Sequence, residues 1–314
     1  EAFHRYCDMY RFHPQVVAHD LHPDYLSTRF ATEMNLQKIE VQHHHAHIAS
    51  CLFENQFTGK AIGICFDGTG LGTDGNIWGS EFFISDLKQS EKLFSLDPVK
   101  FPGGDNVVKE TWRTALGYLM KTFQNESFFS HLRAFKNIEN AKIEMAFQAF
   151  QKEINTFKTC GMGRLFDAVA ALTGICNQPG FHAEAPMRLE NIVHKNEPGY
   201  YPMEIKDNFI TTDALIENVV KDVENRTTPD IISAKFHNSI VIVSVELAIK
   251  MKLQTGIKHV ALSGGVFQND YLLGKLEEML SNNGFEILRH RQLAYNDGNI
   301  APRQIATASE LITN

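Results

Sequence analysis

The chain has 314 residues, of which 43% are hydrophobic, so it can bury a large core and is of the size at which one core commonly divides into two. The formal net charge of -7 gives no electrostatic reason for a long polyanion to bind, which argues against nucleic acid as a partner. An anion bound by this protein is therefore expected to be small and held locally.

The cysteines, the apolar runs and the N-terminus bear on the cellular compartment of the protein and on its relation to a longer chain. The five cysteines are odd in number, widely spaced and without a CxxC pair, which favours reduced thiols in the cytoplasm over a disulfide framework or a zinc ribbon. No apolar run approaches the length of a membrane span, so no membrane partner is expected. The N-terminal sequence has neither an apolar signal segment nor an initiator Met, and we expect the chain to be part of a longer protein.

The first half of the chain predicts strands joined by a glycine-rich loop. Val16 to Ala18 is a short apolar strand, and a helix is expected to follow from about Tyr25. Ala61 to Phe66 and Ile77 to Ile84 are predicted strands, and the DGTGLGTDGN segment between them is predicted as a loop. Residues 85 to 160 are expected to form an insertion or the edge of a lobe, with helices after the turn FPGGD, and not a part of the central sheet.

The second half is mainly helical, with one further strand. A helix is predicted from Gly163, and Ala234 to Leu253 is a long, largely buried helix. His259 to Leu262 is an apolar strand that ends in SGGVFQND, and a leucine-rich helix follows it. Because strands and helices alternate, the sequence predicts a mixed α/β architecture with an N-terminal lobe over 1–155 and a C-terminal lobe over 156–314.

The histidine-rich segment VQHHHAH predicts a metal site. His43 and His47 are four residues apart, so on a helix both imidazoles lie on one face and can bind one ion. No Glu follows the first His, which excludes the HExxH protease motif. The alternative is a histidine-rich helix start without a metal.

The glycine-rich segment after the first long strand predicts a phosphate loop. Gly68, Gly70 and Gly75 allow close approach of the backbone to phosphate, and Asp67 can hold a cation beside it. The alternative is a glycine- and aspartate-rich hairpin that binds no ligand.

Two further motifs lie at turns. Ser263, Gly264 and Gly265 stand between a strand and a helix, where a glycine pair suits a flat ligand or a phosphate, although a tight turn without a ligand is also consistent. Asp297, in an Asn-Asp-Gly turn, can complete a His/His/Asp set that suits iron or zinc if the fold brings it to the two histidines, and is otherwise an ordinary turn.

Taken together, the motifs resemble the C-terminal region of the HypF family of hydrogenase maturation carbamoyltransferases. The resemblance covers almost the whole chain in order and is carried by DLHPDYLSTRF, VQHHHAHIASC, FDGTGLGTDGNIWGSEF, FPGGD, GRLFDAVAALTG, EAPMRLE, FHN and LSGGVFQN. It implies an actin/hexokinase-like, two-lobed α/β fold with mixed sheets and a nucleotide cleft. The related tRNA threonylcarbamoyl-transferases and antibiotic O-carbamoyltransferases share this fold.

The resemblance also implies the roles of particular residues. Metal ligands would be His43, His47 and Asp297, with Asp67 a further candidate, and the metal would be iron or zinc, with magnesium possible beside a nucleotide. ATP or carbamoyl adenylate would contact residues of the phosphate loop and of an adenosine pocket: Gly68, Thr69, Gly70, Asp74, Gly75, Gly163, Arg164, Asp167, Ser263, Gly264, Gly265, Gln268 and Asn269.

In this family an upstream YrdC-like domain makes carbamoyl adenylate, and the region resembled here passes the carbamoyl group to the C-terminal cysteine of the partner HypE, for the cyanide ligands of [NiFe] hydrogenase. We expect the acceptor thiolate to attack the carbamoyl carbon directly, with His44 or His45 as a candidate base and packing as the alternative role for both. Rival hypotheses are another acceptor, either an antibiotic hydroxyl or a tRNA amine, and a non-catalytic nucleotide-binding module.

The chain departs from the family pattern at two motifs. Ala183 stands where the family has a glycine in EGEAAM. Asn299, Pro302 and Arg303 replace small or apolar residues of NDGGIALGQ, and Arg303 is expected to crowd the site or to perturb it electrostatically. The metal site near Asp297 is therefore the part of the resemblance most in question.

Overall fold

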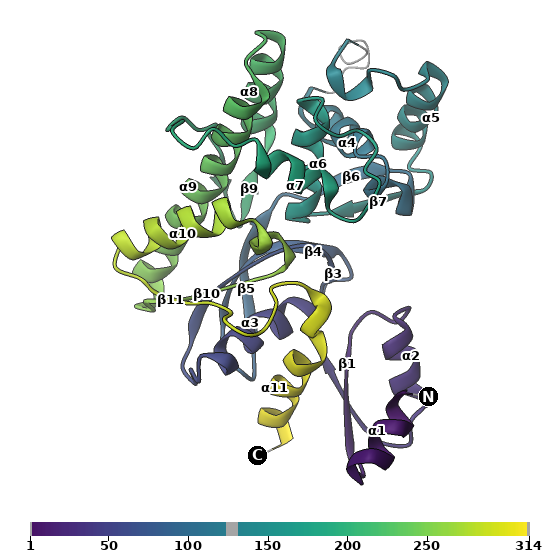
Figure 1. Ribbon diagram of the computed structural model, residues 1–314, viewed down its shortest axis with the longest axis vertical. Helices are drawn as coiled ribbons and strands as arrows, with labels where there is room; N and C mark the ends of the chain where they lie inside the picture. The colour runs from purple at the N-terminus through teal and green to yellow at the C-terminus, as the bar shows by residue number, and fades with distance from the viewer. Residues whose placement is uncertain (1, 124–130, 313–314) are drawn as a thin grey trace.

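The computed structural model describes residues 2–123 and 131–312, which form two sheets surrounded by helices. The smaller sheet pairs β1 (Val16–Asp20) with β2 (Gln37–Val41) in parallel, beside α1 (Ala2–Tyr10) and α2 (Leu26–Glu33). Figure 1 shows this small unit to one side of the molecule, with the C-terminal helix α11 (Ile300–Ile312) between it and the larger sheet. The two ends of the described chain therefore lie in the same region.

The larger sheet is mixed and has the strand order β11-β10-β3-β4-β5-β9-β8, with β7 paired to β4 and β6 paired to β7. β3, β4 and β5 are antiparallel, whereas β10 is parallel to both β3 and β11. A mixed α/β architecture was predicted and is confirmed. The strands of this sheet are β3 (Ala61–Leu71), β4 (Ile77–Ser85), β5 (Ser90–Leu96), β6 (Val99–Pro102), β7 (Thr156–Thr159), β8 (Glu204–Lys206), β9 (Phe209–Thr211), β10 (His259–Ser263) and β11 (Glu286–Leu288).

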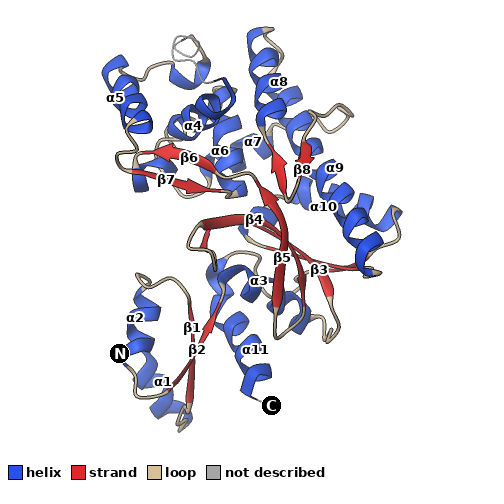
Figure 2. Ribbon diagram, turned by 180° about the vertical axis from the view of Figure 1, so that it is seen from behind, coloured by secondary structure: helices blue, strands red, loops and turns tan. Residues whose placement is uncertain are grey.

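Helices cover this sheet and carry most of the remaining chain (Figure 2). α3 packs on β3, β4 and β10, and α6 packs on β3 and β4. One hydrophobic core runs through the described residues from Ile48 to Phe285. The helices are α3 (His43–Glu54), α4 (Trp112–Phe123), α5 (Asn140–Gln151), α6 (Met162–Leu172), α7 (Glu184–Asn191), α8 (Asp213–Glu224), α9 (Pro229–Thr255) and α10 (Asp270–Asn282).

The core and the larger sheet contain residues from both sides of the expected lobe boundary between residues 155 and 156. For example, β10 from the second half pairs with β3 from the first. The division into two lobes at this boundary stays a prediction.

The predicted elements agree with the structure at most positions. β1, β4, β10 and α6 lie where strands and a helix were predicted, and Tyr25 is the N-cap of α2. The predicted helix from Ala234 to Leu253 lies within α9. The leucines of the last predicted helix, Leu272, Leu276 and Leu280, are all buried on one side of α10.

The predicted DGTGLGTDGN loop is wrong in its first half, because β3 continues to Leu71. The register with β4 is irregular between Phe66 and Gly70, and the turn that follows begins only at Gly72. A Cβ at Gly70 would lie 2.6 Å from the ring of His44 and 2.9 Å from that of His43. This glycine therefore lets the strand pass close beneath two histidines of α3.

The expectation that residues 85 to 160 lie outside the central sheet is also wrong. The predicted helices α4 and α5 are present, but β5 pairs with β4, and β7 joins β6 to the same sheet. The burial of Phe94, Leu96 and Phe101 explains this, because the apolar residues of a polar segment face the core while the polar ones face outward.

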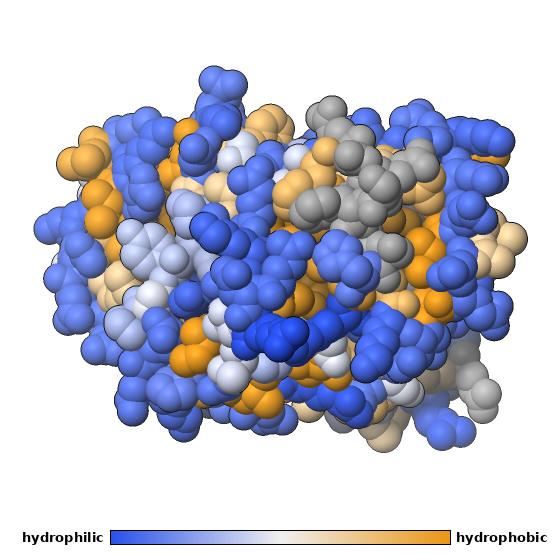
Figure 3. Space-filling view, turned by 90° about the horizontal axis from the view of Figure 1, so that it is seen from above, coloured by the Kyte–Doolittle hydropathy of each residue, from blue (hydrophilic) through white to orange (hydrophobic). Residues whose placement is uncertain are grey.

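Helix α9 is long and apolar enough to cross a membrane, by length and composition alone. The prediction that no apolar run reaches this length is therefore wrong. However, 78% of the most apolar window of α9 is buried inside the protein, where the helix packs against α8 and α10. The face of the molecule in Figure 3 is mostly hydrophilic, with apolar residues in small separate patches. The apolar composition of α9 is thus explained by its place in the core.

Ala183, one of the departures from the family pattern, adopts a left-handed backbone conformation with φ 61° and ψ 17° at the start of α7. This conformation costs a residue with a Cβ about 1 kcal/mol relative to glycine. We therefore expect Ala183→Gly to raise the free energy of unfolding by about 1 kcal/mol in urea denaturation. Ala149→Gly, within helix α5, should lower it by a similar amount, and equal effects of the two changes would contradict this explanation.

Candidate metal centre and glycine junction

The histidine helix α3 is fixed at its start by Gln42. Its side-chain oxygen accepts a hydrogen bond from the backbone N–H of His45 (2.8 Å), and its side-chain nitrogen donates to the carbonyl of Leu71 at the end of β3 (3.0 Å). The first turn of α3 is thereby tied to the strand that carries Asp67. Helix and strand meet with the histidines between them.

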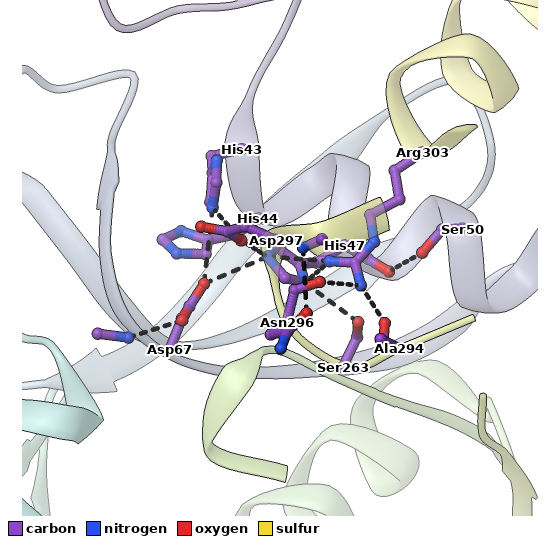
Figure 4. Close-up of polar contacts among 12 residues, drawn as sticks. His43, His44, His47, Ser50, Asp67, Ser263, Ala294, Asn296, Asp297 and Arg303 are labelled. Carbon is purple, nitrogen blue, oxygen red and sulfur yellow. Dashed lines mark hydrogen bonds and ion pairs between the residues drawn. The ribbon is translucent and has the colours of Figure 1, made fainter. Parts of the chain in front are cut away.

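Four side chains of metal-ligand type converge at this contact: His43 and His47 from α3, Asp67 from β3 and Asp297 from the turn before α11. Their candidate ligand atoms all lie within 4.8 Å of one another. His47 Nε2 is 3.2 Å from Asp67 Oδ2 and 3.0 Å from Asp297 Oδ1, and His43 Nε2 is 3.5 and 3.3 Å from the same two atoms. Figure 4 shows the side chains directed toward one another. We refer to these four residues as the His/Asp cluster.

The cluster is buried on one side and open on the other. The two histidine side chains are at most 2% exposed, whereas that of Asp297 is 59% exposed. His43 Nε2 and Asp67 Oδ2 are buried and have no hydrogen-bond partner. Unpaired ligand atoms, two imidazoles and two carboxylates form a donor set that suits iron or zinc, so the residues present fit a divalent cation.

Asp20, at the end of β1, stands behind His43 and was not identified from the sequence. Its Oδ2 lies 2.8 Å from His43 Nδ1 in a fully buried contact. A carboxylate on the second ring nitrogen directs the first toward a metal, which is the usual arrangement of metal-binding histidines. The sequence signal was an aspartate at the end of a buried strand.

Without a cation, the carboxylates of the cluster stabilise the positively charged imidazolium form of His43. Burial acts to lower the pKa of His43, but the hydrogen bond to Asp20 and the nearby carboxylates of Asp297 and Asp67 outweigh it and raise that pKa well above its ordinary value. Burial acts to raise the pKa of Asp67, yet the two nearby imidazoles of His43 and His47 hold it well below the usual range. The site therefore favours positive charge.

Arg303, the departure from the family pattern that was expected to crowd or perturb the metal site, lies in this site. It is completely buried, and one guanidinium nitrogen contacts both ring nitrogens of His47, at 3.1 Å from Nε2. The other donates to the carbonyls of Ala294 and Asn296. The expected crowding is thus observed, and it falls on His47 and not on His43.

The two candidate bases lie away from the open side of the cluster. His44 is completely buried, and its Nδ1 is 3.3 Å from Glu81, whose own pKa burial raises to about 7. His45 Nε2 lies 2.9 Å from the carbonyl oxygen of Asp86. Burial lowers the pKa of both histidines. The ring of His44 packs against that of His43, with centroids 5.2 Å apart, but neither histidine belongs to the His/Asp cluster. A role as base stays a prediction for both.

Four glycines from three segments meet next to the His/Asp cluster. A Cβ at Gly163, in the first turn of α6, would lie 3.2 Å from the Cα of Gly68, and one at Gly265 would lie 3.2 Å from Asp67 Oδ1. Gly264, with φ 107°, packs its backbone against Phe66 of β3. This glycine junction brings the predicted phosphate loop, the amino end of α6 and the Ser-Gly-Gly motif together.

The other nucleotide-binding candidates divide into two groups. Arg164 and Asp167 form an ion pair of 2.8 Å on α6, beside Gly68. Asn269 caps α10 and contacts His237, and the exposed Gln268 accepts a hydrogen bond from the side chain of Asn296 next to the cluster. These four lie on the segments that form the junction.

The remaining candidates belong to the β3–β4 hairpin. The side chain of Asp74 accepts hydrogen bonds from Trp78 Nε1 and the Asn76 backbone, as a turn residue does, and Gly75 is exposed at the same turn with φ 77°. Thr69 is exposed on β3. A phosphate-binding role for these three stays a prediction. Of the other departures, Pro302 is exposed, and the side chain of Asn299 lies outside the described part of the chain.

The predicted nucleotide cleft also stays a prediction. Two surface hollows among the described residues lie elsewhere, one along Phe3, Tyr6 and Tyr10 of α1 and one beside Arg133 and Thr173.

Comparison with known proteins identifies the fold. A solved structure, full-length HypF in a phosphate- and nucleotide-bound form, matches all of this chain with a TM-score of 0.93 and 40% identity. HypF from T. kodakarensis matches 95% of it with a TM-score of 0.85 and 26% identity. The protein thus has the Kae1-like, actin/hexokinase-related α/β fold that the resemblance implied.

The family follows from the sequence matches. Residues 63–304 match the family described as carbamoyltransferase, Kae1-like domain, second subdomain, and residues 1–54 match the HypF Kae1-like domain. Carbamoyltransferase HypF of Synechocystis sp. is 34% identical over 97% of this chain. The chain belongs to the HypF carbamoyltransferase family. It spans 41% of the Synechocystis protein and 41% of each solved structure, and therefore corresponds to a part of these proteins.

Proposed function

We propose that this region transfers the carbamoyl group of carbamoyl adenylate to the C-terminal cysteine thiol of a HypE-type acceptor protein, in the cytoplasm, for the cyanide ligands of [NiFe] hydrogenase. A YrdC-like domain of the longer protein would supply the adenylate. The transferase class is supported by the name of the relatives, and nucleotide binding by the nucleotide-bound form of a structural neighbour. The observation that carries the proposal is the position of the His/Asp cluster beside the glycine junction.

In this reaction the acceptor thiolate forms a C–S bond to the carbamoyl carbon, the bond from that carbon to the phosphate oxygen breaks, and AMP leaves with the electron pair. The junction of Gly68, Gly163 and Gly265 allows the backbone to approach the phosphate, and the amino end of α6 favours its negative charge. Asp20 holds His43 toward the cluster. A cation held by the cluster would polarise the carbonyl oxygen or neutralise phosphate charge.

The four buried cysteines of the described chain are not suited to carry the carbamoyl group as an intermediate. Cys51, Cys65, Cys160 and Cys176 are buried. Burial raises the pKa of all four, that of Cys51 to about 12, so none is a ready thiolate. This supports direct transfer from the adenylate to the acceptor.

The test is single-turnover transfer from preformed carbamoyl adenylate to three acceptors: a HypE-type peptide ending in cysteine, an alcohol and a tRNA adenosine amine. We expect the thiol alone to be carbamoylated, as measured by mass spectrometry. Carbamoylation of the alcohol or the amine instead would assign another acceptor. If calorimetry shows tight nucleotide binding but no acceptor reacts, the region is a binding module and the proposal is wrong.

A further inference from the structure

A row of hydrogen bonds leads from His47 of the cluster to a carboxylate on the far end of α3. Ser263 Oγ lies 3.3 Å from His47 Nδ1 and 2.9 Å from His290 Nε2, and His290 Nδ1 lies 2.8 Å from Glu54 Oε2. The side chains of His47 and His290 are 0% exposed, and that of Glu54 is 11% exposed. Figure 4 shows the inner end of this row, where Ser263 approaches His47. We call these four residues the Glu54 row.

The carboxylate end determines the direction of every hydrogen bond in the row. Glu54 Oε1 accepts the backbone N–H groups of Arg291 and Leu293, which fixes the carboxylate in place. A carboxylate only accepts, so His290 Nδ1 donates to it, and Nε2 of the neutral ring must accept. Burial lowers the pKa of His290 to about 4, which keeps this ring neutral near pH 7.

The same assignment of donors and acceptors extends from His290 through Ser263 to His47. Ser263 Oγ–H donates to His290 Nε2, so toward His47 its oxygen can only accept, and it favours the tautomer of His47 with the proton on Nδ1. The lone pair of His47 then lies on Nε2, the atom 3.0 Å from Asp297 and 3.2 Å from Asp67. The row therefore presents to the cluster the form of His47 that binds a cation.

We propose that His290 and Glu54 are positioning residues that hold His47, through Ser263, in the orientation and tautomer required for binding a divalent cation. This inference rests on the metal centre of the proposed function. His43 has a corresponding support in Asp20, so each histidine of the cluster is held from behind by a carboxylate, one directly and one through two intervening side chains.

Arg303 acts against this row. Its guanidinium can only donate, and it contacts the same Nδ1 that Ser263 approaches. A hydrogen bond from Arg303 to Nδ1 places the ring proton on Nε2 and removes the lone pair from the cluster. Cation binding at Nε2 of His47 therefore requires that the contact of Arg303 with Nδ1 be replaced by a hydrogen bond from Nδ1–H to Ser263.

The experiment titrates the protein with Co²⁺ and records both its affinity and its visible absorption bands, which report the ligands around the ion. Ser263→Ala, Glu54→Gln and His290→Phe each interrupt the row. We expect a loss of affinity of about 10- to 100-fold and altered absorption bands for each. His290→Gln, whose amide can still accept from Ser263, should recover part of the affinity.

The matched control is His259→Gln, on the same strand as Ser263, where the histidine pairs with Glu286 instead of the row. It should leave affinity and spectrum unchanged. Unchanged Co²⁺ affinity and spectrum in Ser263→Ala, which removes a single oxygen, would overturn the positioning role even if His290→Phe does not fold. If the unmodified protein binds Co²⁺ no better than His43→Ala does, the metal centre itself is wrong, which is a different result from failure of the row.

Discussion

His43→Ala is expected to lower the affinity of the protein for Zn²⁺ or Fe²⁺ more than about 100-fold. Removing a metal ligand should lower the affinity more than the about 10- to 100-fold that follows from removing a residue hydrogen-bonded to a ligand. Arg303 contacts His47 and not His43. The Nε2 atom of His43 is buried and has no hydrogen-bond partner, and Asp20 holds the ring at Nδ1. Calorimetry with the metal alone measures this affinity. The single-turnover transfer rate should fall with it in metal-loaded protein.

The matched control for this change is His45→Gln, two residues along the same helix. His45 contacts the carbonyl of Asp86 and is not part of the His/Asp cluster, so metal affinity should be unchanged. Equal affinities of His43→Ala and the unmodified protein would show that the cluster is a hydrogen-bonded group without a metal. Loss of transfer with unchanged metal affinity would give His43 a different role.

Arg303→Gln is expected to raise metal affinity about 100-fold, which corresponds to about 2.7 kcal/mol. The guanidinium contacts a ligand of the cluster and is a fixed positive charge. Two unit charges 4 Å apart interact by about 4 kcal/mol at an effective dielectric constant of 20, and Asp67 and Asp297 offset part of this repulsion. Glutamine keeps a donor for the carbonyls of Ala294 and Asn296 but removes the charge.

Arg289→Gln supplies the control for a lost positive charge, because Arg289 is exposed and pairs with Glu277 away from the cluster. Its metal affinity should equal that of the unmodified protein. An affinity that Arg303→Gln leaves unchanged or lowers would mean that Arg303 supports the cluster. Arg303→Gly, which restores the small residue of the family pattern, should act in the same direction as Arg303→Gln.

The parts of the site that sequence could predict are those carried by short, local patterns. The spacing of His43 and His47 places two imidazoles on one helical face, and Asp67 was recognisable as an aspartate directly after the apolar run from Ala61 to Phe66. Their meeting with Asp297 was a hypothesis, because only the packing of α11 and its preceding turn against α3 brings these residues together.

The supporting residues could not be predicted for the same reason. Glu54 and His290 are 236 positions apart in sequence, and their contact depends on how β11 and the following turn fold against α3. The extent of β3 was missed because glycines suggest a loop, whereas here Gly70 is required by the histidine rings above it. The direction in which Arg303 points is likewise a property of the folded turn and not of its sequence.

The most direct test of the metal centre is anomalous diffraction from crystals grown with Zn²⁺ and a non-hydrolysable ATP analogue. We predict one zinc peak about 2.0–2.2 Å from Nε2 of His43 and of His47 and from a carboxylate oxygen of Asp67 or Asp297, with the phosphates at Gly68, Gly163 and Gly265. A cluster without a peak, or phosphates bound away from these glycines, would contradict it.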